Sequence, residues 1–247
     1  DYAKYFPSIH FRYEPRRDLV AHASYSTSSA RPAISVIVPG TTVSYNSSTG
    51  LGSVSQNNPG LKPQYTENYD LSLEYYFEPA GVLSAGWFHK DIRDFIQGSS
   101  RILGPGADNG FNGNYAGFDF STRTNLGEAK IDGLEFNYNQ RFTNLPKPFD
   151  GLGLFANYTK LTTSGKYSDG ANVLANFVPK TYNVGLSYDW RGFGARVEYH
   201  YKSAYVSGVD NSNFLLSNTV TDDPTVDLNL SYKWKPWLTA FVDVVNI

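Results

Sequence analysis

The sequence predicts an all-β fold, an antiparallel up-and-down transmembrane β-barrel of which about ten strands are present. Three observations predict it. Apolar and polar residues alternate along the predicted strands, the connections alternate between short and long, and tryptophans gather beside the short connections. A period of two residues is typical of a strand that has one apolar and one polar face.

The stretch Thr225–Ile247 shows the alternation most clearly. One face is apolar and ends in aromatic rings at the turn, whereas the other carries carboxylate, amide and ammonium groups. A strand between lipid and an aqueous interior has this arrangement. The apolar positions are Val226, Leu228, Leu230, Tyr232 and Trp234, and the polar positions are Asp227, Asn229, Ser231 and Lys233.

The same pattern recurs along the chain as about five hairpins, whose strands of about ten residues match a tilted membrane span. The predicted strands are Ser8–Glu14, Leu19–Tyr25, Thr66–Phe77, Val82–Gln97, Glu128–Phe142, Leu152–Thr163, Thr181–Trp190, Phe193–Lys202, Thr225–Trp234 and Leu238–Val244.

Short and long connections alternate without exception, as the periplasmic turns and extracellular loops of outer-membrane barrels do. A Greek-key sandwich has no reason to alternate so regularly. Within the first long connection, Ile34–Val38 is predicted to form a local strand. The short turns are Pro15–Asp18, Glu78–Gly81, Thr143–Asp150, Arg191-Gly192 and Lys235–Trp237, and the long connections are Ser29–Lys62, Gly98–Gly127, Ser164–Lys180 and Ser203–Pro224.

Tryptophan and proline positions agree with this assignment. Trp190, Trp234 and Trp237 flank short turns, where one membrane interface is expected. All 13 prolines lie in connections or at strand ends, as a continuous hydrogen-bonded ladder requires.

Composition excludes several classes of protein. A net charge of −2 offers no electrostatic basis for binding nucleic acid. The absence of cysteine excludes disulfides, zinc ribbons and a thiol nucleophile. No apolar run is long enough for a helical membrane span, and mean hydropathy is −0.39, but barrel strands carry a much weaker hydropathy signal.

Three segments resemble the C-terminal half of TonB-dependent outer-membrane receptors, and the similarity extends over nearly the whole chain. They are ENYDLSLEYYFEPAGVLSAGWFHKDIRDFI (Glu67–Ile96), LGEAKIDGLEFNYNQRF (Leu126–Phe142) and PTVDLNLSYKWKPWLTAFVDVVNI (Pro224–Ile247).

The resemblance implies a barrel of about 22 strands with a plugged lumen in the bacterial outer membrane. Such receptors import scarce, large ligands, namely ferric siderophores, cobalamin or oligosaccharides, with energy from the TonB complex. The amino-acid sequence of Glu67–Ile96 resembles that of family members from carbohydrate-scavenging bacteria. Residues 1–247 are expected to form the C-terminal portion of the barrel domain, as a fragment without the plug, the TonB-contacting N-terminal region or the last strand.

The expected partners are outer-membrane lipid, the TonB complex and an extracellular small molecule or oligosaccharide, with no cofactor, metal or catalytic residue. Arg196, Glu198, His200, Asp227 and Asn229 are predicted to line the lumen; Arg196–Lys202 as a catalytic cluster is the less favoured interpretation. The second long connection carries the aromatic residues Tyr115, Phe118 and Phe120. They could stack on a sugar or an aromatic siderophore, or they could pack on neighbouring loops.

Three other groups of residues are weighed as sites and not favoured. His10 and His22 lack a third ligand for a metal. Asp70, Glu74 and Glu135 are better explained as scattered lumenal acids than as a glycosidase pair. The third group lacks the spacing and closing glutamate of a calcium-binding loop. It consists of Asp108, Asn109, Gly110, Asn112 and Asn114.

Two alternatives to the import receptor remain open. One is a complete small outer-membrane barrel that acts as a channel or surface protease, although such a barrel must pair its first and last strands. The other is a secreted β-sandwich that binds sugar, which would require the apolar faces to pack between two sheets.

Overall fold

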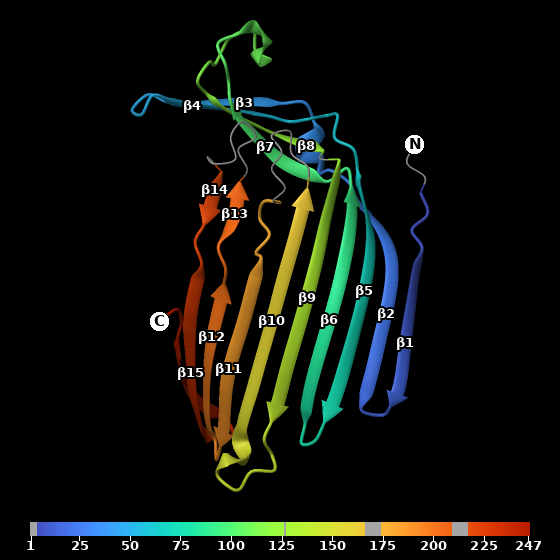
Figure 1. The fold of residues 1–247 in the computed structure, drawn as a ribbon. Helices are drawn as coiled ribbons and strands as arrows, with labels where there is room; N and C mark the ends of the chain where they lie inside the picture. Colours follow the sequence, from blue (N-terminus) through green and yellow to red (C-terminus); the bar gives the residue numbers. More distant parts are fainter. Residues whose placement is uncertain (1–3, 126, 166–173, 209–216) are drawn as a thin grey trace.

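A computed structural model describes residues 4–125, 127–165, 174–208 and 217–247. Its main element is one curved, ten-stranded antiparallel sheet in the order β1-β2-β5-β6-β9-β10-β11-β12-β15-β16 (Figure 1). Strands that are neighbours in this sheet follow one another along the chain, apart from short strands inside the long connections. The predicted all-β, up-and-down antiparallel architecture is therefore confirmed, and so is the number of main strands.

The strands of this sheet are close to those predicted. They are β1 (Ser8–Arg16), β2 (Leu19–Ala30), β5 (Gln64–Phe77), β6 (Gly81–Arg93), β9 (Glu128–Arg141), β10 (Leu152–Gly165), β11 (Lys180–Trp190), β12 (Phe193–Lys202), β15 (Asp223–Lys235) and β16 (Leu238–Val244).

The register places apolar residues beside apolar residues across the sheet. Leu73 pairs with Ala21 on one side and Ala85 on the other, and Ala85 pairs in turn with Phe136. Paired residues point to the same side of a sheet. The alternation seen in the sequence therefore becomes one continuous apolar face.

This apolar face is open. Side chains at its centre, including Leu71, Leu73 and Leu186, expose 52%, 47% and 57% of their surface. No second sheet packs on them within the described residues. The sandwich alternative is therefore wrong for this part of the chain.

The opposite face is polar and carries hydrogen-bonded rows of side chains. In one row, Asn157 accepts a hydrogen bond from Asn183 at 2.6 Å, and His200 Nδ1 lies 2.7 Å from Asn183 Oδ1. Aromatic rings on this face cover glycines of the neighbouring strands: a Cβ at Gly185 would lie 2.1 Å from the Phe155 ring. The ring fills the space that the missing side chain leaves.

The long connections contain more regular structure than the sequence predicts, and they lie at one end of the sheet (Figure 1). The predicted strand Val82–Gln97 is two strands, because Asp94 adopts a left-handed conformation (φ 54°) after β6. The additional elements there are β3 (Thr41–Asn46), β4 (Leu51–Gln56), β7 (Ile96–Ile102), β8 (Asp119–Asn125), β13 (Tyr205–Gly208), β14 (Asn218–Val220) and the short 3-10 helix η1 (Ala107–Asn109). Another short 3-10 helix, η2 (Phe149–Gly151), lies at the end of the short turn between β9 and β10.

The predicted local strand Ile34–Val38 is wrong. Residues Ile34–Ile37 form a single helical turn, α1, closed by a 3.1 Å hydrogen bond from Val38 N to Ile34 O. The Asn57 side chain donates to the carbonyls of Ser35 and Val38 at 2.8 Å each, so these acceptors are not available to a strand partner.

The largest buried cluster lies where the main sheet meets the long connections. It contains Ile92, Ala129, Ile131, Leu174 and Ala175. Phe95 and Phe177 pack against it, with ring centroids 6.5 Å apart. No helix among the described residues has the length and apolar character to cross a membrane. Residues Asp1–Ala3 and the middles of the last two long connections lie outside the described residues.

Candidate functional site

A second, smaller sheet is built from two of the long connections. Its strand order is β3-β4-β8-β7, and the β4–β8 pair is parallel. The register gives it two different faces, because residues that pair across strands share a side. One face carries a row of hydroxyl groups, which comprises Thr42, Ser55, Ser121 and Ser100.

The other face of the small sheet is apolar and covered. Val54 and Leu103 expose 0% and 1% of their surface. Phe120, the register partner of Val54, lies edge-on to Phe111 at 5.8 Å between ring centroids, and the Arg101 guanidinium lies 5.4 Å from the Phe120 ring centre. This packing holds the small sheet to the loop formed by residues 103–118.

Asn109 organises that loop. Its side-chain amide donates to the carbonyls of Gly104 and Asn114, both at 2.9 Å, and its side-chain oxygen accepts from the backbone N–H groups of Phe111 and Gly113. Only 4% of its surface is exposed. The segment from Asp108 to Asn114, considered above as a calcium-binding loop, is thus a turn centred on Asn109. The Asn109 side-chain amide hydrogen-bonds to the backbone of this turn.

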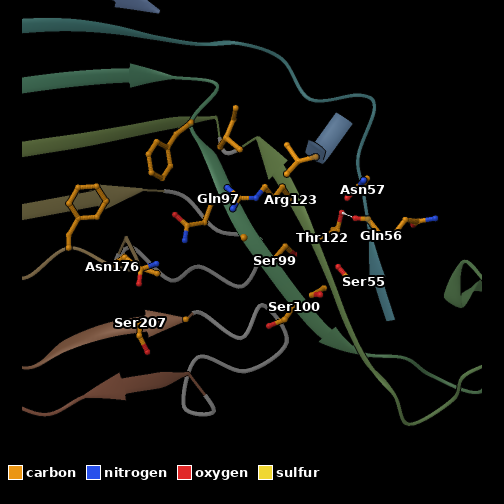
Figure 2. Close-up of a pocket in the computed structure, with 18 residues that line it drawn as sticks. Ser55, Gln56, Asn57, Gln97, Ser99, Ser100, Thr122, Arg123, Asn176 and Ser207 are labelled. Carbon is orange, nitrogen blue, oxygen red and sulfur yellow. Dashed lines mark hydrogen bonds between the residues drawn. The ribbon is translucent and has the colours of Figure 1, made fainter. Parts of the chain in front are cut away.

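The hydroxyl face borders a pocket of about 640 Å³ (Figure 2). The pocket lies between β7, β8 and β4 of the small sheet and two further segments, which contribute Asn176 and Ser207. Ser55, Ser100 and Ser121 of the hydroxyl row line it. Its volume is typical of small-molecule sites, which range from about 300 to 1,000 Å³.

Two lining residues have no internal partner within the described part of the chain. Gln97 exposes only 9% of its surface, yet its side-chain amide makes no hydrogen bond there. Among the described residues that line the pocket, Arg123 is the one charged residue, and its guanidinium forms no ion pair with another of them. Buried polar groups are normally hydrogen-bonded, so an amide at a pocket wall with no protein partner is available to bind a ligand.

The residues predicted to line the lumen are brought together on the polar face of the main sheet. Arg196 pairs with Asn229 and Glu198 with Asp227 in the β12–β15 register. Arg196 forms an ion pair with Glu198, while His200 Nε2 lies 3.3 Å from Glu198 and 3.4 Å from Asp227. These side chains thus form one connected polar network on this face of the sheet.

The loop aromatics predicted to bind ligand are placed elsewhere. Tyr115, Phe118 and Phe120 are not among the residues that line the 640 Å³ pocket. Tyr115 lies 5.6 Å from Phe118, and Phe118 stacks on Tyr45 at 5.8 Å. These contacts occupy the apolar side of the small sheet.

The structure does not bring together the histidines considered as a metal site or the acids considered as a catalytic pair. His10 pairs with Ser24, whereas His22 pairs with Arg12. Asp70 accepts a hydrogen bond from Ser24, and Glu74 accepts one from Tyr76. Glu135 pairs with Gly86 and Thr159. Among the described residues, no three His, Asp or Glu side chains are grouped closely enough to hold a metal.

Sequence reasoning missed the pocket residues. The alternation of Ser53, Val54 and Ser55 is a strand signal inside the first long connection, but it is short and surrounded by turn residues. No sequence signal pairs this segment with Asp119–Ser121, although it is the parallel β4–β8 contact that builds the pocket wall.

The sequence profile of the family described as "TonB dependent receptor-like, beta-barrel" matches residues 1–247. The chain belongs to the TonB-dependent receptor family. It is therefore a bacterial outer-membrane receptor protein with part of a barrel. The family is one of transport receptors. No curated protein matches the sequence.

Solved TonB-dependent receptors share the fold. A mutant of the ferric enterobactin receptor from Pseudomonas aeruginosa, in complex with enterobactin, is 18% identical over 98% of this chain, with a TM-score of 0.70. The siderophore receptor PirA from Acinetobacter baumannii is 17% identical over 98%, with a TM-score of 0.68. The copper transporter OprC is 16% identical over 97%, with a TM-score of 0.69. This chain spans 35%, 36% and 33% of those proteins.

Proposed function

We propose that residues 1–247 are the C-terminal portion of the barrel domain of an importer that is powered by the TonB complex. The observation that carries this proposal is the family match over the entire chain. The ligand is a scarce, large molecule of one of three classes: a ferric siderophore, cobalamin or an oligosaccharide. The chain takes part in binding and translocation and performs no chemical conversion.

The arrangement of the two sheets supports this role. A barrel wall with an apolar outer face and a polar inner face can surround an aqueous path. The pocket lies at the end that carries the long connections, where a ligand would arrive from outside. The polar network around Glu198 and His200 lies on the polar face of the main sheet, and in the proposed barrel that face would contact a plug or water.

The small complete barrel receives no support from the sheet. Strand β1 pairs only with β2, and strand β16 pairs only with β15, among the described residues. A barrel closed by these ten strands would need β1 and β16 to pair, because an open edge leaves backbone groups unsatisfied in lipid.

Energised uptake tests the proposal. The full receptor that contains this chain is produced in a Gram-negative host that lacks its own receptors for the three ligand classes. Labelled ligands of each class are then supplied. We expect accumulation of one class, and we expect that accumulation to stop when the TonB gene is deleted. Accumulation that is unchanged by that deletion would indicate a passive channel and contradict the proposal.

A further inference from the structure

Of the three ligand classes, the pocket beside the small sheet fits one best. We infer that it binds a saccharide that carries a carboxylate, an acidic sugar, with the carboxylate at Arg123 and hydroxyl groups at Gln97 and the serine row. This inference rests on the proposed import function. It goes further in naming the ligand chemistry and the residues that recognise it.

The side-chain amide of Gln97 has unused hydrogen-bonding capacity that a sugar hydroxyl can satisfy. Its NH2 group offers two donors and its oxygen accepts up to two hydrogen bonds. Leaving such a group buried without a partner costs about 1–3 kcal/mol. A ligand group that can both accept and donate removes this cost, and a sugar hydroxyl does both.

The hydroxyl row offers further hydrogen-bonding groups to a saccharide. Ser55, Ser100 and Ser121 line the pocket from three adjacent strands. Each hydroxyl donates one hydrogen bond and accepts others. A row of such groups complements the successive hydroxyls of a saccharide and offers no dedicated ligand for a metal ion.

Apolar surface in the same pocket suits the other side of a sugar ring. Phe95 and Phe177 are half-buried, line the pocket and lie 6.5 Å apart. Sugar rings present C–H groups on their faces and hydroxyls around their edges. The pocket offers both kinds of surface on different walls.

The charge of the pocket decides between saccharides and ferric chelates. Among the described residues that line it, Arg123 is the single charged one. A ferric tris-catecholate carries several negative charges, and one guanidinium cannot balance them. One guanidinium does match one carboxylate, and such charge-assisted, bidentate hydrogen bonds are the strong ones.

Binding to the full receptor in detergent tests the inference by titration calorimetry. The probes are glucuronosyl-maltose (maltotriose whose non-reducing glucose is oxidised to glucuronate, so that it carries one carboxylate), maltotriose as the matched neutral trisaccharide, and ferric enterobactin. We expect glucuronosyl-maltose to bind at least about tenfold more tightly than maltotriose, as a charge-assisted contact predicts. Equal affinities for the two trisaccharides, or binding of ferric enterobactin alone, would overturn the inference.

Variants assign the contacts. Arg123→Gln is expected to bring the affinity for glucuronosyl-maltose to that for maltotriose, and Arg31→Gln, a substitution of an exposed arginine outside the pocket, is the matched control. Gln97→Met keeps the side-chain volume and is expected to weaken both saccharides about tenfold. If Arg123→Gln and Arg31→Gln bind alike, Arg123 does not hold the carboxylate.

The two proposals fail in different ways. If no saccharide binds but another ligand accumulates in a TonB-dependent manner, the ligand inference is wrong and the import function holds. If glucuronosyl-maltose binds as expected but its uptake is independent of TonB, the pocket assignment holds and the proposed energy source is wrong.

Discussion

At Leu228 and Asn229, neighbouring side chains meet opposite environments. Leu228 lies between Val197 and Val244 in the register of the apolar face. Asn229 lies between Arg196 and Asp243 and donates a hydrogen bond to the Asp243 carboxylate. A shift of one residue along a strand therefore exchanges lipid for water.

We expect Leu228→Arg to destabilise the folded protein by about 2–4 kcal/mol where the position is near the bilayer midplane. Asn229→Arg is the matched control and is expected to cost little, because the new guanidinium lies in a polar environment beside Asp243. Urea titration of the protein folded into lipid vesicles measures both changes. Equal costs would contradict the assignment of the two faces.

Gln97 shows the limit of single-residue reasoning. In the sequence it is the last residue of a predicted strand, Val82–Gln97, and nothing distinguishes it from other polar strand ends. Its burial and its lack of a partner arise because Phe95, Ala175 and Phe177 gather around the same pocket. Only the folded arrangement identifies it as a candidate binding residue.

At the scale of elements, the two sheets are held by different means. The main sheet follows from alternation and from hairpin turns between consecutive strands. The small sheet depends on contacts between distant segments, such as the 2.9 Å hydrogen bond from the Asn58 side chain to Arg123 O, which spans 65 residues. The loop that covers its apolar face is held by Asn109.

Asn109→Ala is expected to loosen the loop formed by residues 103–118. It removes a buried amide and leaves the N–H groups of Phe111 and Gly113 and the carbonyl of Gly104 without their bonds. An unsatisfied group costs about 1–3 kcal/mol when it is buried, and less where it is half-buried, as the residues Phe111 and Gly113 are.

Amide hydrogen exchange in the folded protein measures this change, and the exchange of the Phe111 and Gly113 amides is expected to accelerate about tenfold or more. Asn114→Ala is the control, since Asn109 contacts the Asn114 backbone carbonyl and that group remains. Unchanged protection in Asn109→Ala would show that aromatic packing alone holds the loop.

At the scale of the whole molecule, the open edges of the main sheet are decisive. Every residue of β1 and of β16 is exposed, and each strand has a single neighbour. Exposed strand edges are sites of further pairing. In the receptor, β1 and β16 would each pair with a further strand of the barrel.

We therefore expect the isolated 247-residue chain not to form a closed monomeric barrel in detergent. Gel electrophoresis with and without heating measures this, because folded outer-membrane barrels migrate as compact species until they are heated. A compact, heat-modifiable monomer would contradict the open sheet and favour the small complete barrel. Oligomers or an unfolded band would agree with it.

The sequence by itself determined the strands of the main sheet, their two faces and the alternation of short and long connections. These features are local, because side-chain direction repeats every two residues along a strand. The alternation from Val226 to Lys233 therefore predicts which side of the sheet each residue occupies, without knowledge of the neighbouring strands. The predicted residues Arg196, Glu198 and His200 share one face for the same reason.

The tertiary structure decided where the long connections go. The helical turn at Ile34–Ile37, the parallel pairing of β4 with β8 and the pocket at Gln97 and Arg123 all depend on which distant segments meet. Such pairings leave no periodic trace in the sequence, since their geometry is set by loop closure and by the burial of side chains from several strands.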